Sequence, residues 1–282
     1  MGYLDLRNIK RLRLKKNQPP IITLTTDFGL TDIYVGEMKG VIFQINPQAQ
    51  IVDITHSIPP QNLFSAAFQI NNVYQYFPAG SIHIIVVDPG VGSQRRSIVC
   101  QTEKATFVCP DNGICTKIFE QEELIRAIEI TNLNFCLPQV SCTFHGRDVF
   151  APVAAYISCG ISLTDLGPEI SNITMLSIPQ PKITEDGIIG EVIWIDHFGN
   201  AITNVSMKSF KSTFFNAKFA IQIAGMEIDR LSSFYSESDV GSTLALVNSS
   251  GNIEIAVNQG SASSILNIKV GEKILFLKIL PS

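Results

Sequence analysis

Two kinds of apolar patterning divide the sequence near Pro179, and this division constrains the fold more than any other feature. Before it, the apolar runs IITLTT, QIVDIT and SIHIIVVD alternate with segments whose apolar residues recur at helical spacing. Short continuous runs are typical of buried strands, and the periodic segments are typical of helices. We therefore predict an α/β domain over residues 21–180, with a mostly parallel sheet and flanking helices.

The rest of the chain has short apolar segments separated by turn signals, which predicts a smaller all-β domain, either a sandwich or a barrel. Its strand segments are GIIGEVIWID, AITNVS, FAIQIAG, TLALVN, IEIAVN and KILFLKI. A helical pattern is visible only near residues 206–210. The predicted domain covers residues 187–282 and follows the linker LSIPQPKITEDG.

Charge is distributed unevenly along the chain. The formal net charge is −4, yet residues 1–16 contain six Lys or Arg and one acidic residue. The acidic remainder argues against nucleic acid as a partner. We predict that residues 1–20 are a basic, disordered extension. The alternative is a weak amphipathic helix, formed by the leucines of this extension, that contacts a membrane or a partner.

Localisation is predicted from three features of the sequence. No secretory signal is visible, and no run of about 18 apolar residues predicts a membrane span. The six cysteines contain no C-x-x-C pair and mostly lie in apolar segments, which is typical of reduced, buried thiols. We therefore expect a cytoplasmic protein.

Polar side chains follow the predicted strands of the first domain at the points where the strands end. These clusters contain Asp27, Asp53 with Thr55 and His56, Asp88, Asp111 to Gly113, and Phe144 to Asp148. Because ligands bind beyond the carboxyl ends of parallel strands, we expect a binding site at this edge of the sheet.

Several kinds of site receive no support from motifs. The sequence has no G-x-G-x-x-G or P-loop pattern for a nucleotide and no G-x-S-x-G elbow for a serine hydrolase. Asp27, Asp32, His56, Asp88 and His145 leave metal-assisted hydrolysis open. No closely spaced pair of ligands brings them together, so we expect no metal site.

The loop VVDPGVGSQRRS places an acid and a base seven residues apart. Asp88 leaves a buried strand and needs a partner near low dielectric, and Gly90 and Gly92 allow the chain to turn tightly towards Arg95. An ordinary turn beside a surface cation is the alternative. His145, in FHGRD, is either part of the same site or a structural histidine.

The segment IDHFGNAITN of the second domain can present an aromatic face and an amide edge together. Asp196, Phe198 and Asn200 surround Gly199, an arrangement that suits a planar heterocycle. A β-hairpin turn is the alternative, and NSSG at 248–251 has the same ambiguity.

Eight segments in the same order resemble one family. They are TTDFG-x-x-D, VDITHSIPPQN, VVDPGVGSQRR, PDNG, TFHGRDVFAP, DLGP, DHFGNAITN and NSSGNIEIAVNQG. The chain resembles the S-adenosyl-L-methionine hydrolases, also called adenosyl-hydroxide transferases, which are relatives of the fluorinase and chlorinase enzymes. This resemblance implies hydrolysis of S-adenosyl-L-methionine to adenosine and L-methionine by attack of water on C5′.

The resemblance also implies catalytic roles. Asp88, Arg95 and His145 match the Asp, Arg and His that surround the attacking water. The halide-using relatives have a tyrosine at position 88, a tyrosine-serine pair at 145–146, and an insertion within the segment QTEKATFVCPDNG, so these three differences favour water as nucleophile. Arg95 would weaken Asp88 as a base, so Asp88 is expected mainly to position the water.

The substrate-binding residues implied by the resemblance come from both domains. Asp27 would accept the ribose hydroxyls, and Asp32 would meet the methionine ammonium. Phe198 and Asn200 would contact adenine, the segment of Asn258 would close over its edge, and Ser249 would reach the methionine end. The expected set also includes Phe144, Asp196 and Tyr235. Ser250 departs from the halide-using relatives, which have an arginine there for the carboxylate.

The assembly implied by the family is a homotrimer with sites between subunits, and no cofactor is expected. Two alternatives stay open. One is a protein that binds S-adenosylmethionine or adenosine without turnover. The other is a halide-using synthase of the same family.

Overall fold

The structure is a computed structural model that describes residues 19–215 and 217–279. Residues 1–18, most of the predicted basic extension, lie outside the described residues. The chain divides into two compact units, and the boundary between them in the sequence lies between Leu176 and Ser177. No helix within the described ranges is long and apolar enough to span a membrane.

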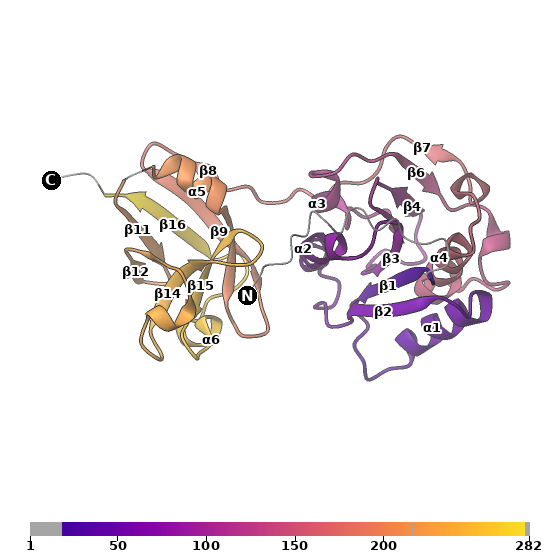
Figure 1. The fold of residues 1–282 in the computed structure, drawn as a ribbon, viewed down its shortest axis with the longest axis horizontal. Helices are drawn as coiled ribbons and strands as arrows, with labels where there is room; N and C mark the ends of the chain where they lie inside the picture. Colours follow the sequence, from indigo (N-terminus) through magenta and orange to yellow (C-terminus); the bar gives the residue numbers. More distant parts are fainter. Residues whose placement is uncertain (1–18, 216, 280–282) are drawn as a thin grey trace, which may run out of the picture. The chain divides into compact units, whose positions relative to one another are not determined.

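The first unit contains one sheet flanked by helices (Figure 1). Its strands are β1 (Ile21–Thr26), β2 (Gln50–Thr55), β3 (Ser81–Val86), β4 (Ser97–Gln101), β5 (Ala105–Pro110), β6 (Arg126–Glu129) and β7 (Glu169–Ile170). Its α-helices are α1 (Tyr34–Ile45), α2 (Leu63–Val73), α3 (Thr116–Phe119) and α4 (Ala151–Ser158). Shorter helical turns are η2 (Tyr74–Tyr76), η3 (Leu133–Phe135), the π-helical turn η4 (Gly146–Phe150) and η5 (Leu163–Asp165).

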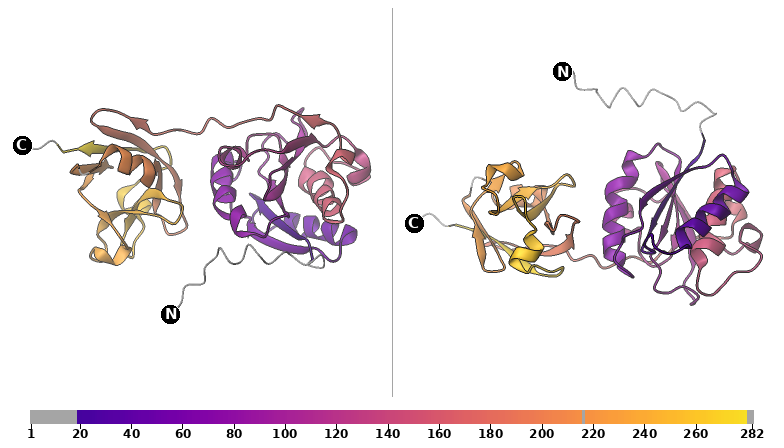
Figure 2. Two further views of the ribbon diagram at one scale, coloured as in Figure 1. Left: turned by 45° about the horizontal axis from the view of Figure 1, so that its top comes forward. Right: turned by 90° about the horizontal axis from the view of Figure 1, so that it is seen from below.

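The helices cover both faces of this sheet, as the views in Figure 2 show. All six residues of β3 are buried. Neighbouring β3 side chains point to opposite faces, so Ile84 packs with residues of α1 and α4, while Ile85 packs with residues of α2 and α3. A strand that is buried on both faces reads as a continuous apolar run, which is why SIHIIV shows no alternation.

The sheet is mixed, which corrects the prediction of a mostly parallel sheet. In the described residues its strand order is β2-β1-β3-β5-β4-β6-β7. Strands β2, β1, β3 and β5 are parallel, whereas β4, β6 and β7 pair antiparallel with their neighbours. β4 and β5 are joined by residues 102–104, a connection too short for a parallel crossover.

Several elements of the first unit have the bounds that the patterns predicted. The IITLTT and QIVDIT runs form β1 and β2, and the segment of helical spacing between these two runs contains α1. The helical segment after Phe144 begins with the π-helical turn η4 and continues as α4.

The second unit is built on one sheet. Its strands are β8 (Lys182–Ile183), β9 (Gly187–Ile195), β10 (Ala201–Ser206), β11 (Phe219–Ile223), β12 (Met226–Ile228), β13 (Leu231–Ser232), β14 (Thr243–Val247), β15 (Asn252–Val257) and β16 (Lys273–Lys278). Its helices are α5 (Met207–Thr213), η6 (Tyr235–Glu237) and α6 (Ala262–Leu266).

This sheet is nearly closed and resembles a barrel. In the part of the unit that the structure describes, the strand order is β12-β11-β16-β9-β10-β15-β14-β13, and β8 pairs with β9. β12 near one end of the order also contacts β14 near the other. One apolar cluster fills the interior, and it includes Phe210, Phe276 and Ile255. The sheet therefore surrounds a single core.

Candidate active site

Three acidic side chains follow parallel strands of the first unit at the same edge of the sheet. Asp27 follows β1, and Asp111 follows β5. Asp88 lies two residues beyond β3. The chain leaves β1 for β2 on one side and returns to β3 on the other, so the ends of β1 and β3 form the switch point of the sheet. Ligands bind at such switch points in open α/β sheets.

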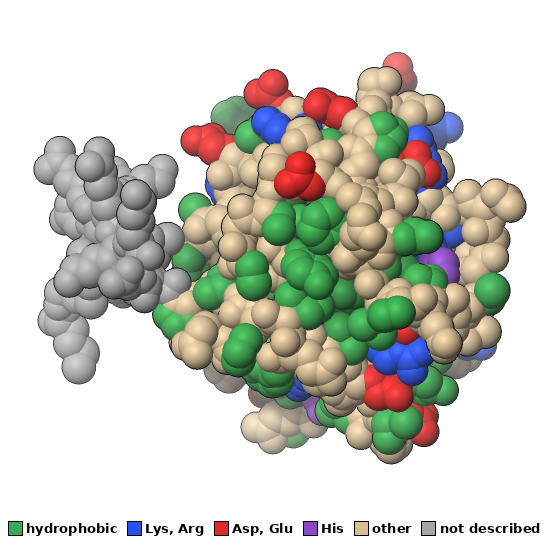
Figure 3. All heavy atoms as spheres, turned by 90° about the vertical axis from the view of Figure 1, so that its right-hand side faces the viewer, with side chains coloured by type: hydrophobic (Ala, Val, Ile, Leu, Met, Phe, Trp, Pro, Cys, Tyr) green, Lys and Arg blue, Asp and Glu red, His purple; other side chains and the backbone are tan. Residues whose placement is uncertain are grey.

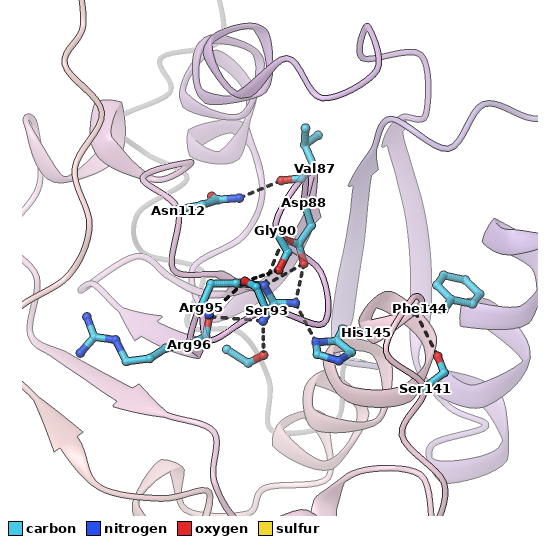
Figure 4. Close-up of polar contacts among 11 residues, drawn as sticks. Val87, Asp88, Gly90, Ser93, Arg95, Arg96, Asn112, Ser141, Phe144 and His145 are labelled. Atoms are coloured by element: carbon cyan, nitrogen blue, oxygen red, sulfur yellow. Dashed lines mark hydrogen bonds and ion pairs between the residues drawn. The ribbon is translucent and has the colours of Figure 1, made fainter.

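Arg95 reaches this edge because β4 runs antiparallel to β5. Ser97 at the start of β4 pairs with Pro110 at the end of β5, so the residues just before β4 return to the edge at which β3 ends. Arg95 Nε donates to Asp88 Oδ1 at 3.0 Å and to Oδ2 at 2.9 Å, and Nη2 donates to Oδ2 at 2.5 Å (Figure 4). The Asp88 side chain is only 5 % exposed, so this is a buried ion pair.

The other N–H groups of Arg95 also have acceptors within the protein. Nη2 donates to His145 Nδ1 at 2.7 Å. Nη1 donates to Ser97 Oγ at 2.7 Å and to the backbone carbonyl of Arg96 at 3.4 Å. The guanidinium carbon lies 5.5 Å from the centre of the Phe150 ring. An arginine has five N–H donors, and here the protein engages them all. Arg95 therefore acts as a frame that holds Asp88 and His145.

The contact with Arg95 determines the tautomer of His145. A guanidinium can only donate, so Nδ1 must accept, and the proton of the neutral ring is on Nε2. Burial, and then the neighbouring Arg95 charge, lower the pKa of His145. The ring is therefore neutral at neutral pH and offers an Nε2–H donor.

The backbone around His145 is irregular and internally anchored. His145 directly precedes the π-helical turn η4, a distortion that is frequent at functional sites. Asp148 is fully buried and accepts from the backbone N–H of Ser141 at 2.8 Å and from Arg147 Nε at 2.7 Å. These bonds tie the segment before His145 to the helix after it.

Gly92 brings the Asp88 loop against the segment that leads to His145. Its φ is +75°, and a Cβ atom there would lie 2.2 Å from the carbonyl oxygen of Cys142. Only glycine combines this backbone conformation with so close an approach. The two segments that carry Asp88 and His145 are therefore in direct backbone contact.

The two acids predicted to bind ribose and ammonium lie before α1. Asp27 Oδ2 accepts from the backbone N–H of Gln61 at 2.8 Å, so one of its oxygens is already engaged. Gln61 has a φ of +63°, a strained conformation for this residue type that is often found at functional sites. Asp32 lies on the exposed bend before α1. Gln61 was not predicted from the sequence, although IPPQN carries a turn signal.

Phe144 belongs to an aromatic cluster beside the site. Its ring centre lies 5.6 Å from that of Phe28 and 5.1 Å from that of Tyr34, both in edge-to-face contact. These rings line a groove of about 440 Å³. The residues that line the groove are Phe28, Ile33, Tyr34, Glu37, Ser141, Thr143, Phe144 and Arg147. Phe144 and His145 point to different sides of the helix that follows them (Figure 4).

Asp196 in the second unit holds its own turn together. Oδ1 accepts from the backbone N–H groups of Phe198 at 2.9 Å and Asn200 at 2.8 Å, and Oδ2 accepts from Asn200 Nδ2 at 3.0 Å. Gly199 completes the turn with a φ of +84°. Phe198 is 74 % exposed, so the turn presents an aromatic face beside a buried amide.

Tyr235 contacts a buried carboxyl group that was not predicted from the sequence. Its hydroxyl donates to Glu254 Oε1 at 2.6 Å, and Glu254 is only 3 % exposed. Burial, with a smaller effect of the Asp196 charge, raises the pKa of Glu254. Strand alternation places Glu254 on the face opposite Ile253 and Ile255, as is typical of an exposed acid, so the sequence carried no signal for its burial.

The last two predicted binding residues lie near the ends of β14 and β15. Ser249 is exposed in the turn between these strands. Asn258 is buried, and its Nδ2 donates to the carbonyl of Ser238 at 2.7 Å. The joint contact of these residues and the DHFGN turn with one ligand stays a prediction.

Two other polar clusters of the first unit are engaged within the protein. His56 Nδ1 lies 2.8 Å from Thr26 Oγ1, and Nε2 lies 3.1 Å from Asp53 Oδ1 without the alignment of a hydrogen bond. Asp111 accepts from Arg96 Nε at 2.8 Å. Across residues 19–215 and 217–279, no three His, Cys, Asp or Glu side chains are grouped as metal ligands.

Comparison with known proteins shows the family to which the chain belongs. The model of the SAM hydroxide adenosyltransferase N-terminal domain matches residues 22–167, and that of the C-terminal domain matches residues 190–275. The chain belongs to this family. The hydroxide adenosyltransferase match spans both structural units and includes the segments of Asp88 and His145.

Individual relatives cover nearly the whole chain. An (R)-S-adenosyl-L-methionine hydrolase of Salinispora tropica is 35% identical over 260 residues, which is 90% of this chain and 97% of the relative. One of Thermus thermophilus is 36% identical, over 89% of this chain and 97% of the relative. A fluorinase of Actinoplanes sp. is more distant, at 25% identity over 93% and 99%.

A solved structure shares the fold of this chain. An uncharacterized conserved protein from Thermotoga maritima superposes with a TM-score of 0.84 at 36% identity. The match covers 91% of this chain and 99% of that one.

Proposed function

We propose that this protein hydrolyses S-adenosyl-L-methionine to adenosine and L-methionine by attack of water on the ribose C5′. The observation that carries the proposal is the buried chain of contacts from Asp88 through Arg95 to His145. The names of the relatives, hydrolases at about 35% identity and a fluorinase at 25%, support hydrolysis over halide transfer.

The three side chains supply an acceptor and a donor for one water molecule. Arg95 Nη2 contacts both Asp88 Oδ2 and His145 Nδ1, so the two side chains converge on a single nitrogen atom. Asp88 accepts a proton of the water, and the Nε2–H of His145 donates to its oxygen. Water held from two sides is aligned for attack along one direction.

The chemistry needs alignment more than it needs a strong base. The water oxygen bonds to C5′, and the electrons of the C5′–S bond pass to sulfur, so methionine leaves as a neutral thioether. The substrate's sulfonium charge disappears during this step, which a desolvated site favours. The proton released by the water passes to Asp88 late in the reaction.

The substrate contacts follow the residues that match the family. We propose that Asp27 binds the ribose hydroxyls, that Asp32 meets the ammonium, and that the turn with Phe198 and Asn200 binds adenine. The remaining members of the proposed binding set are Phe144, Asp196, Tyr235, Ser249 and Asn258.

We propose that the active form is a homotrimer with sites between subunits. Apolar side chains gather on the face of the first unit drawn in Figure 3, an arrangement typical of interaction surfaces. Leu30 and Ile33, close in sequence to Asp32, are 73 % and 71 % exposed. Light scattering is expected to give three times the 31.0 kDa chain mass.

The proposed reaction requires neither a metal nor a cofactor, and we propose the cytoplasm as its compartment. All six cysteines of the sequence are free thiols in the structure, as expected where the cell keeps thiols reduced.

The test is incubation of the purified protein with S-adenosylmethionine in isotopically labelled water, followed by chromatography and mass spectrometry. We expect adenosine and methionine, with the label on the 5′ oxygen of adenosine and no loss of rate in a chelator. Label in methionine would refute the proposal, and binding without products would identify a sensor.

Two variants and a matched control locate the chemistry. Asp88→Ala and His145→Ala are expected to lower turnover by about a hundredfold or more, which is usual for a lost positioning or acid–base group. Asp165→Ala, an exposed acid of the same unit, is expected to leave turnover unchanged. Near-normal turnover in Asp88→Ala would contradict the assigned role.

A further inference from the structure

The amino-acid end of the proposed substrate presents a carboxylate that needs a cationic partner. Ser249 and Ser250, in the turn predicted to reach this end of the substrate, carry no charge and lie exposed. A carboxylate is bound most specifically by a guanidinium, which offers two parallel N–H donors. The arginines in the segments that carry Asp88 and His145 are therefore the side chains to compare.

Two of these arginines have their donors engaged within the protein. Arg95 contacts Asp88, His145 and Ser97. Arg96 donates through Nε and Nη2 to Asp111, and through Nη1 and Nη2 to Asn172. Both guanidinium groups hold the fold of the site.

Arg147 is anchored at one end and open at the other. Nε donates to the fully buried Asp148 at 2.7 Å. Nη1 lies 3.5 Å from Glu37 Oε1, an ion pair without hydrogen-bond alignment, and Nη2 has no acceptor among the residues that the structure describes. The side chain is 31 % exposed. Its outer N–H edge is therefore directed to solvent while its plane is fixed.

The ring of Phe144 fixes that plane further. The guanidinium carbon of Arg147 lies 5.1 Å from the ring centre, within the range of a cation–π contact. Phe144 in turn packs against Phe28 and Tyr34. A guanidinium held by a buried carboxylate and an aromatic ring loses little conformational freedom when it binds a ligand.

The groove of about 440 Å³ beside Arg147 combines apolar walls with charges of both signs. Arg147 supplies the cation, Glu37 supplies an anion that is 33 % exposed, and the walls include Phe28, Tyr34 and Phe144. This arrangement suits a zwitterion with a hydrocarbon chain, because each charge of the ligand meets its opposite. A simple anion would be repelled by Glu37 and Asp148.

We propose that Arg147 binds the carboxylate of the α-amino-acid end of the substrate, and that Glu37 favours the zwitterion by facing its ammonium together with Asp32. This inference rests on the proposed function, because it takes S-adenosylmethionine as the ligand. The segment FHGRD then has two roles: His145 faces the reacting carbon, and Arg147 determines which sulfonium compounds bind.

The test compares two ligands in the same variants. S-adenosylmethionine has the carboxylate, and decarboxylated S-adenosylmethionine lacks it but keeps the ammonium and the sulfonium. Dissociation constants are measured by calorimetry in an Asp88→Ala background, which suppresses turnover, and adenosine release is measured with Asp88 intact. The ratio of the two dissociation constants isolates the carboxylate contact.

Arg147→Gln is expected to weaken binding of S-adenosylmethionine by about 10- to 100-fold and that of the decarboxylated compound by less than about threefold. Arg147→Lys keeps the charge but lacks the fork, so an intermediate loss is expected. Arg230→Gln, an exposed arginine of the second unit, is the control and is expected to leave the ratio unchanged.

The outcomes separate this inference from the proposed function. If Arg147→Gln lowers the affinity for both ligands equally, or lowers neither, the proposed role of Arg147 is overturned. An unchanged affinity for the decarboxylated compound shows that the groove of the variant has kept its fold. Binding by the parent protein without adenosine release would refute the hydrolase proposal and still leave the ratio to test Arg147. No binding of either ligand by the parent would overturn both.

Discussion

Replacing Arg95 removes a cation that holds both Asp88 and His145, and two substitutions separate its charge from its shape. Arg95→Ala removes every contact of the guanidinium. Arg95→Lys keeps the positive charge but cannot contact Asp88, His145 and Ser97 together, because an ammonium lacks the planar fork. The pair therefore tests whether Arg95 acts by charge alone or as a frame.

The magnitude follows from the burial of the pair. Asp88 is 5 % exposed and Arg95 is 10 % exposed. Removing one partner of such an ion pair costs about 3–5 kcal/mol, because the other charge is left buried without compensation. Part of this cost appears as lost stability, and part appears as lost turnover, because Asp88 no longer holds a fixed position from which to accept from water.

The expected loss of turnover differs between the two substitutions. Arg95→Ala releases both Asp88 and His145, so its turnover is expected to fall by about a hundredfold. Arg95→Lys is expected to lose about tenfold or more, because the charge beside Asp88 stays but His145 is released.

The assay is adenosine release at neutral pH, with urea unfolding of the same samples to measure the free energy of unfolding. Two results would refute the reasoning. One is an Arg95→Ala variant that keeps turnover within about threefold of the parent. The other is an Arg95→Lys variant with the turnover of the parent, which would mean that charge alone accounts for the role of Arg95.

Two further predictions concern stability and the packing of the site. His83 is fully buried, and burial lowers its pKa to about 4 from an unfolded value near 6.5. The unfolded chain thus binds more protons between these values. The parent is therefore expected to lose up to about 3 kcal/mol of stability relative to His83→Gln as the pH falls from 6.5 to 4; urea unfolding with the same pH slope in both proteins would contradict this. Gly92→Ala is expected to lower turnover by about tenfold, because its Cβ would meet the Cys142 carbonyl oxygen at 2.2 Å. Gly225→Ala has a similar φ, +76°, with open space around it, so identical melting temperatures and turnover in both variants would argue against a steric cause.

The fold was predictable where local pattern decides it. The run SIHIIV is buried on both faces and reads as a central strand, and the helical spacing after Ile33 corresponds to α1. The direction of β4 was not predictable in this way, because SIVCQ has the same apolar character in a parallel or an antiparallel strand. Its direction is determined by the short connection to β5 and by pairing with residues far along the chain.

The same limit applies to the candidate site. Asp88 and Arg95 were recognisable from an acid leaving a buried strand towards glycines and a cation, and the antiparallel β4 explains how they meet. Gln61 and Glu254 were missed because their contacts depend on tertiary packing. Gln61 acts through its backbone N–H, which no residue type reveals, and Glu254 depends on Tyr235, which lies on a separate segment.

The charge state of His145 links these contacts to the chemistry of a sulfonium substrate. Asp88 and Arg95 together carry no net charge, so a neutral His145 leaves the water site neutral as well. A protonated His145 could not accept from Arg95 Nη2, and it would place a second cation beside the sulfonium. Burial and the Arg95 charge both lower the pKa of His145 and prevent this. The contact that orients the ring therefore also keeps it neutral, and one guanidinium determines the position of the acceptor, the tautomer of the donor and the charge that the substrate meets.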